Sequence, residues 1–431
     1  MADFDAIVVG SGCAGSVAAY ELAKAGKSIL VVERGNFAGA KNMTGGRVYS
    51  HALKEVFPDF EQEAPLERRI THERISMMAP DANFTIDFSS DEMNVAGQDS
   101  YAILRAPFDQ WLAEKAENAG AEYIYGIAVE SLIIDETGKV GGVMAGEDEI
   151  TADIVLLCDG VNSLLTEKAV GYKRPPASAI AVGIKQTIEL PAAVITDRVL
   201  SGSDDEGSAW LFAGDATKGT FGGGFMYTNK ESISLGIVAG IEATMNHGKA
   251  PVYQMLENLK AHPSVAPLIK GGKIVEHSGH MVPEGGVNIM PELTGDGVLL
   301  AGESAMMCVN LGYQVRGMDF AIAAGMHAGR EAAKALDAGD TSKTGLHGYV
   351  TALEGSFVLK DLRQFQKVPA FMEGFTRMFD GYPQMIRDMM NGMFIVDGTP
   401  VQPMKKQMLP IVKNVGYLNL LKDARGAMKA L

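Results

Sequence analysis

The spacing of apolar and polar residues predicts a parallel-sheet unit at the start of the chain. Residues 4–9 form a short, almost continuous apolar run, which is typical of a strand buried on both faces of a parallel sheet. An Ala- and Leu-rich helix is predicted over 16–25, and Gly26 stands where a glycine commonly ends a helix. A second apolar run follows over 28–32. This part of the chain is therefore predicted to form a strand–helix–strand unit.

Later segments carry the pattern of an antiparallel sheet. They alternate or run apolar between glycine and aspartate turns, and they are 180–189, 208–212, 222–228, 232–239 and 273–282. Helices are expected over 251–260 and 318–336, and over most of the chain from 346 onward. The pattern thus predicts two kinds of sheet followed by a helical region.

Length, charge and cysteine content exclude several classes of protein. The chain has 431 residues, with 38 Lys and Arg against 53 Asp and Glu, and a net charge of −15. We expect no nucleic-acid binding, because affinity for phosphate needs clustered cations. No long apolar run is present and the first residues are acidic, so neither a transmembrane helix nor a signal peptide is expected. Three cysteines do not make a disulfide scaffold, and a soluble, cytoplasmic protein is the expectation.

A glycine-rich turn joins the first predicted strand to the first helix. Gly10, Gly12 and Gly15 form a G-x-G-x-x-G motif, and Glu33 follows at the end of the second strand. The first glycine permits a sharp turn, the second lets the backbone approach a pyrophosphate, and the third lets helix and strand pack closely. The helix N-terminus adds free N–H donors, and Glu33 is suited to accept hydrogen bonds from an adenosine ribose. A dinucleotide site is predicted, with a glycine-rich turn that binds nothing as the alternative.

Two later glycine turns distinguish between NAD and FAD. An apolar run over 153–157 leads to Asp159 and Gly160, and another over 297–301 leads to Gly302 and Glu303. With the first turn, these segments resemble the three motifs of FAD proteins of the glutathione-reductase type. The similar branch contains p-hydroxybenzoate hydroxylase, geranylgeranyl reductases and electron-transfer-flavoprotein dehydrogenases. The resemblance implies FAD as the cofactor.

The resemblance also assigns roles to single residues. The acid of the third motif holds the flavin ribityl chain in this branch, which implies that role for Glu303, although the branch usually has aspartate there. Arg105 is similar to an arginine beside the FAD and is suited by charge to the pyrophosphate. Thr166 and Lys168 stand where many hydroxylases place an arginine, which favours a dehydrogenase. Backbone amides over 312–318 are expected to place positive potential at the flavin N1–C2 carbonyl.

Three further segments narrow the resemblance: the loop over 39–47, the glycine run over 222–227 and the turn over 283–286. They are similar to the FixC-type dehydrogenases of the electron-transfer-flavoprotein–quinone oxidoreductase family. That family accepts electrons from an electron-transfer flavoprotein and passes them to quinone, and its FixC-type members are associated with electron transfer to nitrogenase. FixC-type chains work with a separate ferredoxin-like iron–sulfur subunit, which the resemblance implies as a partner here.

Two alternative functions stay open. One is a geranylgeranyl-reductase-like flavoprotein that reduces isoprenoid double bonds, on a loose similarity over 210–212 and 222–224. The other is a flavin-bearing structural subunit of an electron-transfer complex. A second strand–G-x-G-x-x-G–helix unit is lacking in the sequence, so a donor other than free NADH is favoured.

Cysteines and a histidine pair are the remaining candidates for metal or redox chemistry. Cys13, Cys158 and Cys308 lie in three different motifs, whereas a [4Fe–4S] cluster needs four thiolates, so no cluster is expected in this chain. We interpret them as small buried residues, with a redox or covalent-flavin role as the alternative. His277 and His280 lack a surrounding carboxylate or cysteine pattern, so ordinary histidines are favoured over a metal site.

The C-terminal part carries an apolar stripe and a basic end. Apolar residues recur at three- and four-residue spacings on two helices that we expect to be interrupted near 380–383. They are Phe365, Val368, Phe371, Met372, Phe375, Met378, Phe379, Tyr382, Met385, Ile386, Met389, Met390, Met393 and Phe394. Two interpretations of this stripe stay open. It can be an ordinary core face, or an adaptable surface for a quinone tail, a bilayer or a protein partner. Basic residues outnumber acids over 401–431. This suggests contact with anionic lipid or with an acidic partner, and a solvated helix face is the alternative. Peripheral contact with the inner face of the cell membrane is a further expectation.

These patterns together predict an α/β fold, α+β overall, in three parts. A Rossmann-type FAD-binding domain with a parallel sheet is expected over 1–75, 100–170 and 285–345. An antiparallel-sheet substrate or quinone domain is expected over 76–99 and 171–284, and a helical region over 346–431. No catalytic side chain is predicted, because the flavin itself carries the redox chemistry. The candidate FAD-binding residues are Gly10, Gly12, Cys13, Ala14, Gly15, Glu33, Arg34, Asn42, Gly45, Gly46, Arg47, Arg105, Val129, Asp159, Gly160, Gly302, Glu303, Gly312 and Gly317.

Overall fold

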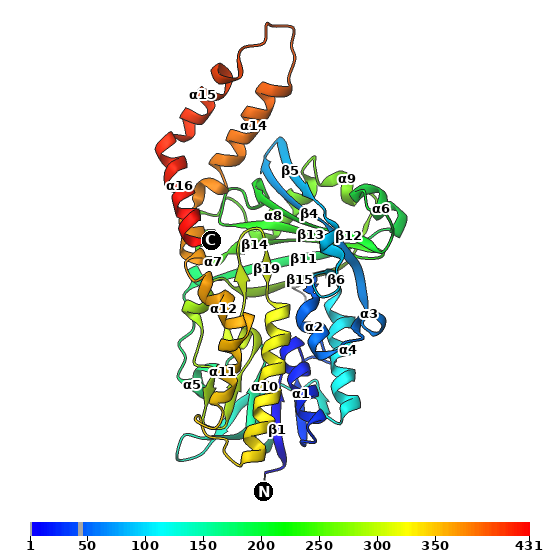
Figure 1. Ribbon diagram of the computed structural model, residues 1–431, viewed down its shortest axis with the longest axis vertical. Coiled ribbons are helices and arrows are strands. Elements are labelled where there is room, and N and C mark those ends of the chain that lie inside the picture. Colours follow the sequence, from blue (N-terminus) through cyan, green and yellow to red (C-terminus); the bar gives the residue numbers. More distant parts are fainter. Residues whose placement is uncertain (1, 42–45) are drawn as a thin grey trace.

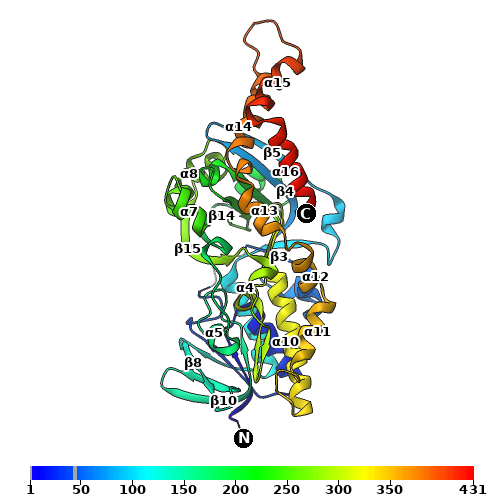
Figure 2. The same cartoon turned by 90° about the vertical axis from the view of Figure 1, so that its left-hand side faces the viewer.

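Two β-sheets follow one another along the long axis of the molecule (Figure 1). The computed structural model describes residues 2–41 and 46–431. The N-terminus lies at the end formed by the first sheet, and a helical region near the C-terminus projects at the opposite end (Figure 1 and Figure 2). The predicted combination of a parallel sheet, an antiparallel sheet and C-terminal helices is confirmed.

The N-terminal apolar run forms the predicted strand–helix–strand unit. It consists of β1 (Phe4–Val9), α1 (Cys13–Lys24) and β2 (Ile29–Glu33), and the two strands pair in parallel. The helix begins three residues earlier than predicted, because Gly12 already has extended backbone and serves as its N-cap. Gly26 follows the helix with a φ of 76°, a conformation that glycine adopts without strain.

The first sheet gathers strands from distant parts of the chain. Its order is β16-β17-β10-β1-β2-β7, and β8 and β9 extend it through the outer half of β10. The bounds are β7 (Glu122–Tyr125), β8 (Val129–Ile134), β9 (Val140–Ala145), β10 (Asp148–Leu157), β16 (Thr294–Gly295) and β17 (Val298–Leu300). β17, β10, β1, β2 and β7 run parallel to one another, so their carboxyl ends meet at one edge.

Glycines allow two helices beside this sheet to pack closely against each other. α1 packs against α10 (Met318–Ala338), which begins at the predicted position. A Cβ at Gly325 would lie 2.2 Å from the carbonyl oxygen of Ala14, and one at Gly329 would lie 2.6 Å from that of Ala18. Larger side chains there would separate the helices. α4 (Arg105–Ala119) packs beside α1.

The second sheet has nine strands in the order β15-β11-β14-β13-β12-β4-β6-β3, with β5 paired to β4. Their bounds are β3 (Arg47–Tyr49), β4 (Leu66–Ala79), β5 (Ala82–Phe88), β6 (Ser100–Ile103), β11 (Ile180–Glu189), β12 (Glu206–Gly214), β13 (Gly222–Thr228), β14 (Ser232–Gly240) and β15 (Lys273–Pro283). All neighbours are antiparallel except β12 and β4. One face buries apolar residues against α6 (Ala192–Val199), α8 (Val252–Ala261) and α9 (Ala266–Ile269). The opposite face is turned toward the cavity described below.

Some strands belong to a different sheet from the one that the predicted domain division would give them. β3 and β6 come from segments expected in the FAD-binding domain, yet they pair with the second sheet. β4 runs through the expected boundary at residue 75. Such short strands carry little pattern of their own, so their partners are set by tertiary contacts. The domain division itself stays a prediction.

The C-terminal region is helical, as predicted, but it is more finely divided. It contains α11 (His347–Gly355), α12 (Phe357–Gln364), α13 (Val368–Gly374), α14 (Gly381–Phe394), α15 (Met404–Val415) and α16 (Tyr417–Ala430). The interruption falls over 375–380, and Pro383 lies inside the first turn of α14, where proline is tolerated. Figure 1 shows α14 and α15 projecting beyond the second sheet.

The apolar stripe of this region is core at its beginning and surface at its end. Val368 and Phe379 are buried, whereas Met393 and Phe394 are exposed. The core interpretation therefore holds for the buried part of the stripe, and the surface for a quinone tail, a bilayer or a protein partner stays a prediction for the exposed part.

Shorter elements complete the fold. They are α2 (Ser50–Val56), α3 (Phe60–Glu63), α5 (Thr166–Val170), α7 (Ile241–His247), β18 (Val309–Asn310), β19 (Val315–Arg316) and the 3-10 helices η1 (Asp91–Asn94), η2 (Ala177–Ala179), η3 (Asp215–Thr217), η4 (Gly286–Ile289), η5 (Gly302–Ala305) and η6 (Thr376–Met378).

Candidate functional site

A cavity of about 440 Å³ is lined by residues of both sheets and of the C-terminal helices. The three glycine-bearing turns, far apart in the sequence, meet around it. The predicted site residues that line it are Gly10, Gly12, Cys13, Ala14, Glu33, Arg34, Gly46, Arg47, Arg105, Val129, Asp159, Gly160, Gly302, Glu303, Gly312 and Gly317. Gly15 lies behind the first turn, and Asn42 and Gly45 lie outside the described residues.

The first turn is shaped by glycine at two positions. Gly10 has a φ of 94°, and a Cβ there would lie 2.6 Å from the carbonyl oxygen of Cys158. A Cβ at Gly15 would lie 1.9 Å from the carbonyl oxygen of Gly10, so only glycine lets the helix approach the turn. The N-cap Gly12 has no side chain to bind the first N–H groups of α1. These donors are therefore available at the cavity, a suitable place for an anionic group.

Glu33 lies at the carboxyl end of β2 and is largely buried. One of its oxygens accepts hydrogen bonds from the backbone N–H of Ser11 at 2.9 Å and from its hydroxyl at 3.1 Å. The other accepts one from the N–H of Gly35 at 2.6 Å. A carboxylate offers about four acceptor positions, so Glu33 is held firmly and retains capacity for a ligand hydroxyl. Arg34 beside it is exposed.

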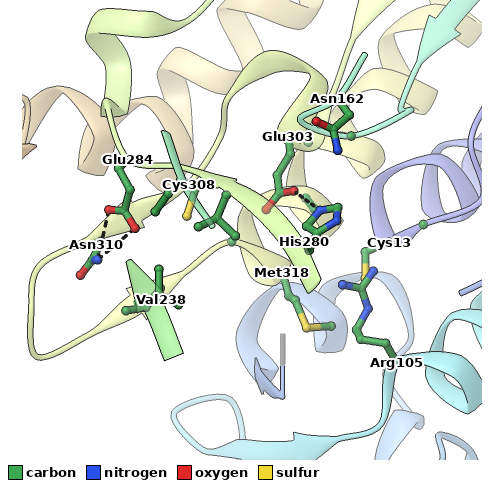
Figure 3. A pocket seen from close by; sticks show the side chains of 18 of the residues that line it. Cys13, Arg105, Asn162, Val238, His280, Glu284, Glu303, Cys308, Asn310 and Met318 are labelled. Carbon is green, nitrogen blue, oxygen red and sulfur yellow. Dashed lines mark hydrogen bonds and ion pairs between the residues drawn. The ribbon is translucent and has the colours of Figure 1, made fainter. Parts of the chain in front are cut away.

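Arg105 is held at the cavity by a buried acid. Its guanidinium donates to both oxygens of Asp109, at 2.9 and 2.8 Å, and the Cys13 thiol lies 3.6 Å from the same carboxylate. Burial alone would lower the pKa of Arg105, but Asp109 raises it above the ordinary value. Burial raises the pKa of the Cys13 thiol, which is therefore neutral. Figure 3 shows Arg105 beside Cys13.

Asp159, in the second turn, has an oxygen without a partner. Its Oδ1 atom is buried and accepts no hydrogen bond from the described residues. Burial raises the pKa of Asp159 to about 6, against the opposing hydrogen bond from Ser163. A buried acceptor of this kind is costly unless a ligand or water satisfies it. Gly160 beside it has a φ of 81° and open space around the position of a Cβ.

Glu303, in the third turn, reaches across to the second sheet. Its Oε2 lies 3.5 Å from Nε2 of His280, and Figure 3 shows this pair between the two walls of the cavity. His277, three residues earlier on β15, points to the other face of the strand and contacts Gln186 at 3.2 Å. In the part of the chain that the structure describes, groups of three or more metal-ligating side chains are not found.

Gly46 and Arg47, at the start of β3, line another side of the cavity. A Cβ at Gly46 would lie 2.5 Å from the ring of Tyr227, so the backbone passes directly over this side chain. The Arg47 guanidinium binds Glu73, donates to the Ser100 hydroxyl at 3.0 Å and lies over the ring of Tyr49. Arg47 is thus engaged by neighbouring side chains at the edge of the cavity.

The apolar wall of the cavity was predictable only in part, and two of its polar residues were not predicted as site residues. Met372, Met378 and Phe379 belong to the apolar stripe described above, and residues 211 and 212 belong to the segment similar to geranylgeranyl reductases. The apolar wall comprises Ile75, Leu211, Phe212, Phe221, Met372, Met378 and Phe379, and the polar residues are Glu284 and Asn310. Glu284 could have been predicted from the two-residue period of a strand. His280, Val282 and Glu284 are two residues apart and all line the cavity. That residues on β4 and β12 and the helical C-terminal residues meet in one wall could not be predicted without knowing the sheet order.

The residues present fit a dinucleotide that carries an apolar ring system. The volume lies in the range of cofactor pockets, roughly 300–1,000 Å³. The helix N-terminus and Arg105 suit a pyrophosphate, and the orphaned Asp159 oxygen requires a polar partner. The glycine and apolar residues of the second sheet suit close approach of a planar ring.

Comparison with known proteins agrees with this geometry. A family model described as the ETF-QO/FixC family C-terminal domain matches residues 368–431, and one described as FAD dependent oxidoreductase matches residues 5–106. Protein FixC of Salmonella typhi is 50% identical over 421 residues, covering 97% of each chain. In Escherichia coli strain K12, protein FixC is 49% identical over 429 residues and covers 99% of both chains. The probable electron transfer flavoprotein-quinone oxidoreductase YdiS of that strain is 46% identical over 428 residues, also covering 99% of both.

Solved structures share the fold at lower identity. A geranylgeranyl bacteriochlorophyll reductase-like protein from Thermoplasma acidophilum has a TM-score of 0.70 at 19% identity, covering 98% of this chain and 99% of that one. The flavin-dependent brominase Bmp2 has a TM-score of 0.63 at 15% identity, covering 95% of this chain and 98% of that one. At these identities the similarity establishes the fold alone.

Proposed function

This chain belongs to the FixC/electron-transfer-flavoprotein–quinone oxidoreductase family of FAD-dependent oxidoreductases, and on that premise we propose that it accepts electrons from an electron-transfer flavoprotein and passes them to a quinone. A separate ferredoxin-like iron–sulfur subunit is part of the proposal. It is supported by the three cysteines of this chain, which are fewer than the four thiolates of a cluster and are each buried as free thiols. A role in nitrogen fixation stays a prediction from the family resemblance.

The observation that carries the proposal is the meeting of three distant glycine turns around one cavity. We propose that the N-terminus of α1 and Arg105 bind the FAD pyrophosphate, that Glu33 binds the adenosine ribose and that Glu303 binds the ribityl chain. When bound, FAD supplies the redox chemistry by accepting and releasing electrons. The protein contributes binding, orientation and the exclusion of water from an apolar cavity.

The apolar wall supports a lipophilic electron acceptor. Phe212 and Phe221 come from the second sheet, and Met378 and Phe379 come from the C-terminal region. Met378 and Phe379 belong to the apolar stripe, which continues along α14 to its exposed end. An apolar wall followed by such a stripe suits a quinone ring and its isoprenoid tail better than a nicotinamide cofactor.

The end of that stripe supports peripheral contact with a membrane. Phe394 is 73% exposed and Val396 is 82% exposed, at the tip between α14 and α15. Lys405 and Lys406 follow at the start of α15 and are exposed. Apolar side chains at a protruding tip, flanked by lysines, suit the boundary of an anionic bilayer. Among the described residues, the helices are too short or too polar to span a bilayer.

The isoprenoid-reductase alternative is supported by fold likeness alone, because the geranylgeranyl-reductase-like structure is only 19% identical. The apolar wall would suit an isoprenoid substrate as well as a quinone. The two functions differ in the group reduced, a carbon–carbon double bond or a quinone carbonyl pair, and this difference can be measured.

Anaerobic reduction followed by addition of acceptor tests the proposal. The purified protein is expected to carry flavin absorbance, to be photoreduced without oxygen, and to be reoxidised rapidly by a soluble ubiquinone analogue. Reduced electron-transfer flavoprotein should reduce it faster than NADH does. A reduced flavin that stays reduced in excess quinone would contradict the assigned acceptor and favour a structural flavin. Reoxidation by geranylgeranyl substrates instead would favour the isoprenoid reductase.

A further inference from the structure

Glu284 is a carboxyl group of the cavity that none of the expected cofactor contacts uses. It follows β15 directly, and its backbone N–H donates to the carbonyl oxygen of Ala179 at 2.8 Å, which fixes the chain at this point. Its side chain lines the cavity together with His280 and Val282, which precede it at two-residue steps. Figure 3 shows its carboxyl beside the amide of Asn310.

The partners of Glu284 differ from those of the neighbouring acid Glu303. Glu303 lies against His280, whereas both oxygens of Glu284 accept from the neutral side-chain amide of Asn310, at 3.3 and 3.1 Å. Within the described residues, ion pairs of Glu284 with Lys, Arg or His are absent. The Cys308 thiol also lies close enough to feel the charge of Glu284. Burial raises the pKa of this thiol, so it is uncharged at neutral pH. One amide offsets the burial only in part, and burial raises the pKa of Glu284 to about 7.

A short series of hydrogen bonds connects this carboxyl to the turn between β18 and β19. Asn310 donates to Glu284 and accepts, through its Oδ1 atom, from the backbone N–H of Gly312 at 2.9 Å. Gly312 lines the cavity and has a φ of 82°. This turn opens the segment whose amides are expected at the flavin N1–C2 carbonyl. The charge of Glu284 is therefore coupled, through Asn310, to the turn beside which the flavin is expected to lie.

We infer that Glu284 is the proton-carrying residue of the redox site, which takes up a proton when the site gains electrons and releases it when they leave. Added electrons make the cavity more negative, and a carboxylate in a poorly solvated cavity responds by binding a proton from solvent. A quinone that receives two electrons needs two protons to leave as quinol. One of them comes from the reduced cofactor together with the electrons, and Glu284 gives the other. The naming of quinone rests on the proposed function, whereas the coupled proton uptake rests on FAD binding alone.

Asp159 is the competing candidate, because burial raises its pKa as well, to about 6. It lies in the second glycine turn, next to the closely packed Gly10 and Cys158. Its orphaned oxygen is the feature that fits a polar group of the ligand, which would fix its protonation state on binding. Comparison of Glu284→Gln with Asp159→Asn therefore assigns the proton to one of the two.

Proton uptake during anaerobic reduction tests the inference without a protein donor or quinone. The FAD-loaded wild type, Glu284→Gln and Asp159→Asn are photoreduced in weakly buffered solution, and a pH indicator reports protons taken up per flavin. The wild type should show a component that is largest just above pH 7 and fades at higher and lower pH. Glu284→Gln should lose this component, and Asp159→Asn should keep it. Equal uptake profiles of Glu284→Gln and the wild type would overturn the inference, as would loss of the component in Asp159→Asn alone.

A second variant tests the inference if Glu284→Gln retains too little FAD to be measured. Asn310→Ala removes the amide that stabilises the carboxylate, so the same component should move to higher pH. An unmoved component would overturn the inference. Failure of the proposed acceptor is distinguishable, because the wild type could take up protons on reduction and still not react with quinone.

Discussion

The turn over 10–15 and the tip over 393–404 show two opposite uses of small and apolar residues. At the turn, a single added methyl group would meet backbone atoms at 1.9–2.6 Å. At the tip, Phe394 and Val396 leave most of their surface open. The backbone of the turn is closely packed, so an added side chain at Gly10 or Gly15 would disturb it. The side chains of the tip are mostly exposed to solvent, so they can be changed without disturbing packing. Changes at the turn should therefore affect stability and FAD content, and changes at the tip should affect association with other surfaces.

The largest effect is expected for Gly15→Ala. Its Cβ would lie 1.9 Å from the carbonyl oxygen of Gly10, so either the helix or the turn must move. We expect a loss of roughly 2–3 kcal/mol in the free energy of unfolding, together with loss of bound FAD. Denaturant unfolding and flavin absorbance per protein measure both. Gly374→Ala on α13 is the matched control, because its Cβ meets open space and should leave stability equal or slightly higher. Equal stability of the two variants would break the comparison.

Glu33→Arg should remove FAD while the chain stays folded. The substitution places a cation where the carboxylate accepts from Ser11 and Gly35 and is expected to face the ribose. Flavin absorbance should fall to background, with a cooperative unfolding transition retained. Glu33→Gln keeps the shape and one acceptor, and it should retain part of the FAD. Undiminished flavin content in Glu33→Arg would contradict the role assigned to Glu33.

A smaller, local effect is expected for Asp423→Asn in the C-terminal region. The Asp423 carboxylate accepts from Arg377 and from the Tyr382 hydroxyl, both at 2.6 Å to one oxygen, and so connects α16 to the segment around α14. The substitution should cost about 1–3 kcal/mol locally and raise protease cleavage after residue 375. Asp388→Asn, in the partly exposed pair with Arg387, should have a smaller effect.

Acidification should weaken the same contact in the wild type. The Arg377 hydrogen bond holds the pKa of Asp423 below its ordinary value of 3.8. The folded state then binds fewer protons than the unfolded state, so this stabilisation is present above that value and is lost as pH falls through the lower folded pKa. Asp423→Asn should show no such pH dependence in protease sensitivity. If protease sensitivity rises equally on acidification in the wild type and in Asp423→Asn, groups other than Asp423 are responsible.

The smallest effect on stability, within about 0.5 kcal/mol, is expected for Phe394→Ser combined with Ile395→Ser. Both residues are exposed, so folding loses little. Binding to anionic lipid vesicles, measured by sedimentation, should fall strongly. Met245→Ser on α7, a residue of similar exposure, is the control and should not change vesicle binding. Unchanged binding by the tip variant would exclude this tip as the membrane contact.

Much of the fold was predictable because its signals are local. The limits of β11 and β13 agree with the apolar pattern, and each turn glycine acts over a few residues. The pairing of β3 and β6 was not predictable, because strands of three or four residues carry no information on their neighbours. The motif residues that line the cavity also carry local signals, and their roles stay predictions. Glu284 and Asn310 were not predicted as site residues, since their meeting depends on how β15 and the turn after β18 approach each other.

The order in which the chain supplies the first sheet has a consequence for biosynthesis. β1 and the turn over 10–15 leave the ribosome first, but their neighbour β10 follows much later, and β17 with the third glycine turn later still. We therefore expect the edge of β1 to stay unpaired until β10 has been synthesised. If all three glycine turns bind FAD as proposed, insertion of the cofactor has to wait for the third turn, and a product truncated before it should carry the first motif without retaining FAD.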